Sequence, residues 1–140
     1  MNSDFIVAVH AMVYLHHKAE TLSSEVLAAN VCTNPARIRR VMSKLKKAGL
    51  VETKEGRLDG GYSYEKTKRV TLGEISEALD VRFAETNWHS GNEDLPCQVA
   101  SGMAGYIDSL YGTINEQCRE YLDGITVADV EKELFRKDHE

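Results

Sequence analysis

The stretch TNPARIRRVMSKLKKAGLV, residues 33–51, has the pattern of a complete helix with its own start and stop signals. Asn34 is a good N-cap, and Pro35 suits the first helical position because its missing N–H would have no partner there. One face carries an apolar stripe: Ile38, Val41, Met42 and Leu45. Gly49 follows as the kind of residue that ends a helix in left-handed backbone. We therefore expect a helix from Pro35 to about Ala48.

A second stripe on this helix is basic and lies on a different face. Its members are Arg37, Arg40, Lys44 and Lys47. One side of the helix can therefore be buried while the other enters the major groove of DNA, which is wide enough for one helix. Guanidinium groups can pair with guanine or phosphate, and the lysines suit phosphate. At the helix start, Thr33, Asn34 and Pro35 would lie near phosphates or base edges. The alternative is a solvated basic surface without a partner.

The flanking segments place this helix in a winged helix-turn-helix. A helix is expected over residues 4–19 and a short one over 25–31, and a tight turn then leads into Pro35. Two short strands follow, at 51–54 and 62–64, joined by a glycine-rich turn. Gly60 and Gly61 are expected to serve backbone geometry. Arg57 at the tip could reach a minor groove, or be a plain exposed loop residue.

Beyond the hairpin, Thr71-Leu-Gly-Glu74 predicts a capping box that opens a helix to about Asp80. Residues 97–123 predict a long helix with a heptad seam, whose members are Met103, Ile107, Leu110, Ile114, Gln117 and Tyr121. Glycines within it cost about 1 kcal/mol each, so it must pack against something, and a second copy is expected. Thr126 and Asp129 cap a last short helix that ends near Phe135.

The expected fold class is therefore mainly α with a small β-hairpin wing. Residues 1–80 would form the winged helix-turn-helix DNA-binding region. Residues 81–140 would add a loop, the long dimerisation helix and a C-terminal helix, within one compact chain. A length of 140 residues fits one domain.

The charge is divided unevenly along the chain. The formal net charge is -5, but residues 1–69 carry +5 and residues 70–140 carry -10. A cationic surface can bind phosphate while the acidic half repels it, which orients the molecule on DNA. No window resembles a membrane span, and the first residues lack the basic segment of a secretory signal. With three widely spaced cysteines, these features predict a cytoplasmic protein. No nucleophile elbow, phosphate loop or zinc-protease motif is present, so we expect no enzyme.

Several segments resemble the Rrf2 family of winged helix-turn-helix transcriptional regulators. They are FIVAVHAMVYL (5–15), LSSEVLA (22–28), the quoted helix (33–51), GGY (60–62), VTLGEISEA (70–78), PC (96–97) and ITVADV (125–130). The resemblance covers nearly the whole chain in the family's order. It implies a homodimer on a palindromic operator, with the long helix forming the dimer. Two-fold symmetry would then place two reading helices in successive major grooves, roughly 34 Å apart.

The sequence departs from the family's pattern at two places. The family's wing has Arg-Gly, two residues and Gly-Gly, whereas here Gly56 is followed by three residues before Gly60. Arg57 would then replace the family's arginine, shifted by one position. Iron–sulfur members carry three closely spaced cysteines after the fourth helix, and only Cys97 matches that region here. We therefore expect no iron–sulfur cluster, no metal site and no other cofactor.

The sequence leaves the switching mechanism open. Cys97 beside the start of the long helix could sense oxidation, with Cys32 or Cys118 of either subunit as its partner, or be a small packed residue. A small effector is the other option. We expect a sequence-specific DNA-binding regulator that acts as a repressor. The competing hypothesis is a winged-helix protein-interaction module without DNA binding, whose binding would lack a steep salt dependence.

Overall fold

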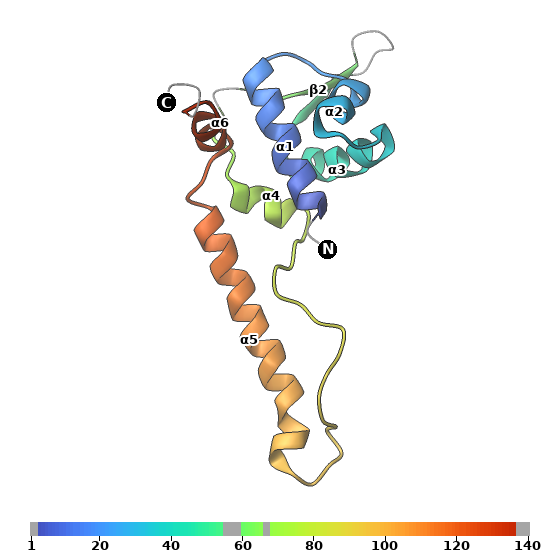
Figure 1. The fold of residues 1–140 in the computed structure, drawn as a ribbon, viewed down its shortest axis with the longest axis vertical. Helices are drawn as coiled ribbons and strands as arrows, with labels where there is room; N and C mark the ends of the chain where they lie inside the picture. The colour runs from blue at the N-terminus through green and yellow to red at the C-terminus, as the bar shows by residue number, and fades with distance from the viewer. Residues whose placement is uncertain (1–2, 55–59, 66–67, 137–140) are drawn as a thin grey trace.

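The computed structural model describes residues 3–54, 60–65 and 68–136 (Figure 1). The described part of the chain folds into helices and one two-stranded sheet. The helices are α1 (Ser3–Lys18), α2 (Ser24–Val31), α3 (Pro35–Lys47), α4 (Leu72–Ala78), α5 (Gln98–Leu122) and α6 (Val127–Arg136), and the strands are β1 (Glu52–Lys54) and β2 (Gly61–Ser63). The expected fold class, mainly helical with a small hairpin, is confirmed.

Helices α1 to α4 surround one hydrophobic core. Met12 and Leu15 of α1 are fully buried, and they share this core with Ile38 and Met42 of α3. Ser23 caps α2 by accepting a hydrogen bond from the Val26 N–H over 3.2 Å. Cys32 ends α2 in left-handed backbone, with φ of 67°, and so turns the chain toward α3. These local signals end α2 and lead the chain into the start of α3.

The wing is a short antiparallel hairpin fastened to the connection between α1 and α2. Thr53 lies opposite Tyr62, and Tyr62 exchanges two backbone hydrogen bonds of 2.9 Å with Leu22. A Cβ atom on Gly61 would lie 2.3 Å from the Leu22 carbonyl oxygen, so glycine is required for this approach. The observed return strand begins one residue earlier than the expected 62–64. Tyr64 instead leaves the sheet, and its hydroxyl donates to the Lys68 carbonyl.

The C-terminal helix returns to the N-terminal half of the molecule. Thr126 and Asp129 cap α6 reciprocally, through two hydrogen bonds of 2.9 Å. The His16 Nδ1 atom of α1 lies 2.9 Å from the Glu131 carboxylate of α6. Figure 1 shows α6 against α1, so α6 joins the body formed by the first four helices. The capping box between Thr71 and Glu74 is also present, as the sequence predicts.

Helix α5 projects away from this body as a single long rod (Figure 1). None of its 25 residues is buried. Residues 79–97 run from α4 to the distant end of α5, where that helix begins, without a helix or strand. The Asn115 side chain ties this segment to α5 by pairing with both backbone polar groups of Ala84, over 2.8 and 3.0 Å. Among the described residues, no helix combines the length and the hydropathy of a membrane-spanning segment.

Candidate DNA-binding surface

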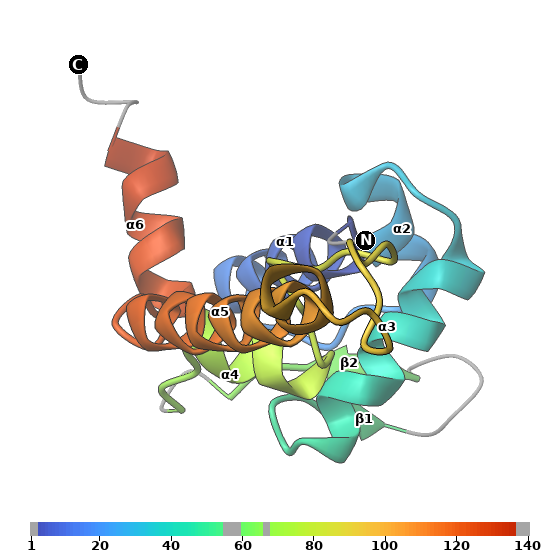
Figure 2. The ribbon, with the colours of Figure 1, turned by 90° about the horizontal axis from the view of Figure 1, so that it is seen from below.

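Helix α3 separates a buried face from an exposed basic face. Its apolar stripe is at most 1 % exposed at every position: Ile38, Val41, Met42 and Leu45. Arg40, Lys44 and Lys47 lie on the other side and are exposed. Arg40 and Lys47 are seven positions apart, about two helical turns, so they lie on one line along the helix. Viewed from below, α3 and the wing lie at the opposite end from α6 (Figure 2).

Local hydrogen bonds cap the N-terminus of α3. The Asn34 Oδ1 atom accepts from the Arg37 backbone N–H over 2.8 Å, and Pro35 occupies the first turn. The capping role expected for Asn34 is therefore confirmed. The backbone N–H of Thr33 donates to Ala28 over 3.0 Å, and this half-buried residue joins the two helices. Contacts of these three residues with DNA stay a prediction.

Two of the four residues in the basic stripe already have an acidic partner. The Asp4 carboxylate of α1 accepts from Arg37 Nε over 2.9 Å and from Arg40 Nη2 over 3.0 Å. Burial opposes the ionisation of Asp4, but the hydrogen bonds and charges of the two arginines outweigh it and lower its pKa. Arg37 is 28 % exposed and Arg40 is 57 % exposed. The stripe therefore consists of two tethered arginines and two exposed lysines.

The stripe chosen from the sequence omits Arg39. This side chain is 56 % exposed and lies 3.9 Å from Glu25 of α2, on the other flank of the exposed face. It directly follows the buried Ile38, so its position one step outside the apolar stripe could have identified it. Arg39 broadens the basic surface beyond a single line of cations.

The structure describes the base of the wing, including Gly60 and Gly61, but not residues 55–59. Gly60 and Gly61 are both half-buried, and the close approach of Gly61 to Leu22 confirms its role in backbone geometry. Arg57 lies outside the described residues, so its proposed contact with the minor groove is a prediction only.

The predicted dimer seam is exposed along α5. Met103, Leu110, Ile114 and Tyr121 are each at least 36 % exposed, and Ile107 is half-buried. The sequence-based seam missed Val99 and Tyr106, each 66 % exposed. Val99 lies four positions before Met103, and Tyr106 lies three after Met103 and four before Leu110. Residues at these spacings are neighbours on one helical surface, which could have revealed them. This apolar surface has no partner within the described part of one protomer.

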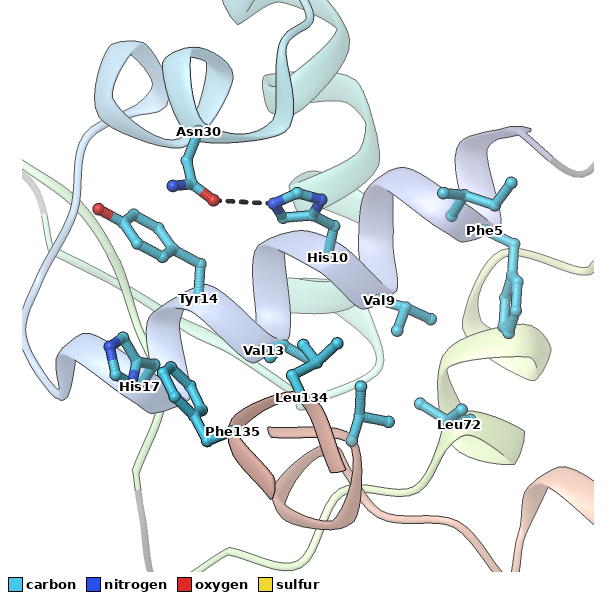
Figure 3. A pocket seen from close by; sticks show the side chains of 12 residues that line it. Phe5, Val9, His10, Val13, Tyr14, His17, Asn30, Leu72, Leu134 and Phe135 are labelled. Atoms are coloured by element: carbon cyan, nitrogen blue, oxygen red, sulfur yellow. Dashed lines mark hydrogen bonds between the residues drawn. The ribbon is translucent and has the colours of Figure 1, made fainter. Parts of the chain in front are cut away.

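A second apolar surface lies between α1 and α6. It is a groove of about 400 Å³, lined along α1 by residues such as Phe5, Val9 and Val13, and closed by Leu134 of α6 (Figure 3). One polar pair stands at its edge, where His10 Nε2 lies 2.8 Å from the Asn30 side-chain oxygen. The groove is thus a hydrophobic surface with very little polar lining.

The three cysteines lie apart. Cys97 is the exposed N-cap residue of α5, and the backbone N–H groups of Ala100 and Val99 lower the pKa of its thiol. Cys32 ends α2, at the opposite end of the molecule from the start of α5 (Figure 1). Cys97 and Cys118 are separated by 21 positions, or about 30 Å of helix. One protomer therefore cannot join Cys97 to Cys32 or to Cys118 in a disulfide without rearrangement.

The same separation tests the fit of an iron–sulfur cluster. Such a cluster needs three or four converging ligands, usually thiolates. Among the described residues no group of three or more His, Cys, Asp or Glu side chains converges in the way that a metal ion requires. The described thiols therefore do not form a cluster site within one protomer.

Comparison with known proteins agrees with this architecture. The family model Rrf2, described as an iron-dependent transcriptional regulator, matches residues 1–133. YwnA of Bacillus subtilis, an HTH-type transcriptional regulator by name, is 27% identical over 135 residues, or 96% of this chain and 99% of that protein.

Solved structures share the fold. A transcriptional regulator from Lactobacillus plantarum superposes with a TM-score of 0.80 at 25% identity, over 100% of both chains. CymR, the global cysteine regulator of B. subtilis, does so with a TM-score of 0.65 at 21% identity, over 94% of this chain and 95% of that one. The protein is a DNA-binding transcriptional regulator of the winged-helix type, not an enzyme, and the chain belongs to the Rrf2 family.

Proposed function

We propose that this protein is a homodimeric repressor that reads a palindromic operator with α3. In this proposal the exposed side chains of α3 enter the major groove, and Lys44 and Lys47 contact phosphates. The wing follows the adjacent minor groove, with Gly60 and Gly61 at its base. The protein would act in the cytoplasm, where its DNA lies.

One observation carries the reading role of α3. Its apolar side is buried almost completely, while its basic side is open to solvent and far from the α6 end of the molecule. A helix held in this way presents its side chains at fixed positions, as a reading helix must. The formal charge of +5 on residues 1–69 also favours approach to DNA through this end.

The dimer proposal rests on α5. A 25-residue helix without a buried side chain does not persist alone in water, and glycines at three positions weaken it further. Its seam includes Met103, Leu110 and Ile114, and the groove between α1 and α6 offers more apolar surface. A second copy would cover both surfaces, and two-fold symmetry would then fix the positions of the two α3 helices relative to each other.

The effector is the least constrained part of the proposal. The exposed thiol of Cys97, with its lowered pKa, supports a response to oxidation. Cys32 is also exposed, and a disulfide between them would have to join different subunits. A small molecule is the other candidate, and either would act by changing the placement of the two α3 helices.

Substitutions on α3 test the reading role. The operator is first selected from a pool of random duplexes with the purified protein. Arg40→Ala is expected to cost about 1–3 kcal/mol of operator binding if this arginine contacts a base. Lys47→Ala is expected to weaken binding to all duplexes and to reduce the slope of log affinity against log salt by about 1.

The control removes the same charge from a distant surface. Lys132 is exposed on α6, and Lys132→Ala should leave affinity and slope unchanged. If neither α3 variant changes binding in a mobility-shift titration, α3 is not the reading helix. Binding that hardly changes between 50 and 200 mM salt would instead favour the protein-interaction module.

A further inference from the structure

A single carboxylate bridges the two arginines of the basic stripe. Asp4 Oδ1 accepts from Arg37 Nε over 2.9 Å, and Arg40 Nη2 lies 3.0 Å from both Asp4 oxygens. A fourth contact, from Arg37 Nη2 to the Ser3 hydroxyl over 2.7 Å, comes from the same turn of α1. Together the three charged groups carry +1 where the two arginines alone would carry +2.

The fold holds this carboxylate in place from two sides. Asp4 lies in the first turn of α1, next to Phe5, which packs against the core. The arginines lie three positions apart on α3, so neighbouring side chains of one helical surface reach the same acid. Asp4 is 28 % exposed; like other aspartates it is ionised at neutral pH, and the two arginines lower its pKa further. The carboxylate is therefore a permanent anion beside the basic face.

This arrangement resembles the contact that DNA itself would make. A guanidinium group binds a carboxylate and a phosphate through the same parallel N–H donors. The Asp4 carboxylate thus occupies donors on Arg37 and Arg40 that a phosphate would otherwise occupy. For either arginine to contact DNA fully, it must give up part of its bond to Asp4.

We infer that Asp4 is a specificity-determining residue: its carboxylate competes with DNA phosphates for Arg37 and Arg40 and thereby weakens binding to non-operator DNA. The inference rests on the proposed reading role of α3. Random duplexes offer the same phosphates without the matching base edges, so the phosphates alone must displace an anion already in place. An operator adds contacts to base edges, which compensate for the displaced carboxylate. Asp4 acts through the arginines and is a positioning residue.

Asp4→Asn tests this inference by removing the charge while keeping the size of the side chain. The probes are a random-sequence duplex and the selected operator, each titrated between 50 and 200 mM potassium chloride. Affinity for the random duplex should rise by about tenfold at low salt, and the salt slope should steepen by about 0.9 for each additional phosphate that the arginines neutralise. The ratio of operator to random affinity should fall.

Glu25→Gln is the matched control. It also removes one negative charge beside α3, but Glu25 and Arg39 are 3.9 Å apart and both largely exposed. Its effect on random-duplex affinity should therefore be small. An equal rise in affinity from Glu25→Gln would assign the effect to net charge and overturn the inference. If Asp4→Asn does not fold, Asp4→Ser serves instead, because serine also removes the charge and keeps a short polar side chain.

A second background separates a direct effect from a structural one. In the double variant Arg37→Ala and Arg40→Ala, Asp4→Asn should no longer change the salt slope, because the groups it acts through are absent. A persistent change there would overturn the inference, as would an unchanged slope in the otherwise native chain. If Lys47→Ala weakens binding while Asp4→Asn does not alter it, only the role of Asp4 fails. If neither changes binding, the reading role of α3 fails with it.

Discussion

Cys97 is the cysteine whose surroundings favour reactivity. It is exposed at the start of α5, where the backbone N–H groups of Ala100 and Val99 stabilise its thiolate. A lowered pKa means that the thiolate persists to lower pH than in an ordinary cysteine. We therefore expect iodoacetamide to alkylate Cys97 fastest of the three cysteines near neutral pH, with an inflection in the rate below the usual thiol value.

Peptide mass spectrometry of samples quenched over time measures this order directly. Cys118 is half-buried, and the Cys32 thiol donates to the Ala29 carbonyl oxygen over 3.7 Å, so both should react more slowly. Cys97→Ser should remove the fast phase. If Cys32 reacts as fast as Cys97 at every pH, the helix N-terminus does not activate the thiol, and thiol sensing by Cys97 loses its physical basis.

At the residue scale, sequence reasoning succeeded where the partner lies within three positions. Asn34 with Arg37, Thr71 with Glu74 and Thr126 with Asp129 are pairs of this kind, and all three caps are present. The bridge from Asp4 to Arg37 spans 33 positions and depends on how α1 crosses α3. No local pattern contains that crossing, so the basic stripe was predicted without its acidic partner.

At the scale of elements, the wing depends on one glycine. An alanine Cβ at Gly61 would lie 2.3 Å from the Leu22 carbonyl oxygen, and φ there is 154°, which side chains rarely adopt. The nearest atoms, from the Leu22 carbonyl group and the Ser23 nitrogen, all belong to the backbone, so the hairpin would have to separate from residue 22. Gly61→Ala should lower the free energy of unfolding by about 1–3 kcal/mol, measured by urea denaturation.

Another glycine provides a control, because its replacement should change the free energy of unfolding in the opposite direction. Gly105 lies within α5, and a Cβ there would meet nothing within 4 Å. Gly105→Ala should therefore raise stability by about 1 kcal/mol, because alanine is the better helix former. A neutral Gly61→Ala variant with an unchanged urea midpoint would show that the wing does not need to approach Leu22 so closely.

The elements themselves were largely readable from the chain. Expected helices over 4–19, 25–31 and 97–123 end within one residue of the observed α1, α2 and α5. Continuous amphipathic patterns and nearby caps explain this agreement. The return strand was misplaced by one residue because its register is set by Leu22, outside the hairpin. The packing of α6 on α1, through His16 and Glu131, was equally hidden from local patterns.

At the scale of the whole molecule, the chain leaves one side of its longest helix uncovered within the described residues. Its longest helix carries an apolar seam on one side, while Asn115 and Arg119 face the rest of the chain on the other, contacting Ala84 and Asp80. One side of α5 therefore already contacts the rest of the chain, and the seam is the side of α5 that stays exposed. A second copy related by two-fold symmetry would cover both seams with one contact.

Leu110→Glu should convert the dimer into a monomer. Leu110 is 40 % exposed in the protomer and lies in the middle of the seam, so a charge there would be buried without a partner in the dimer. Sedimentation at micromolar concentration should give twice the 15.7 kDa chain mass for the native protein and the mass of one chain for the variant.

The control is Gly112→Glu. It places the same side chain on the opposite face of α5, where a Cβ meets nothing within 4 Å, and should remain dimeric. Operator affinity should fall in the monomeric Leu110→Glu variant, because one α3 helix reads only half of a palindrome. A native chain that sediments only at 15.7 kDa would contradict the dimer, and a Leu110→Glu variant that stays dimeric would move the interface away from the seam.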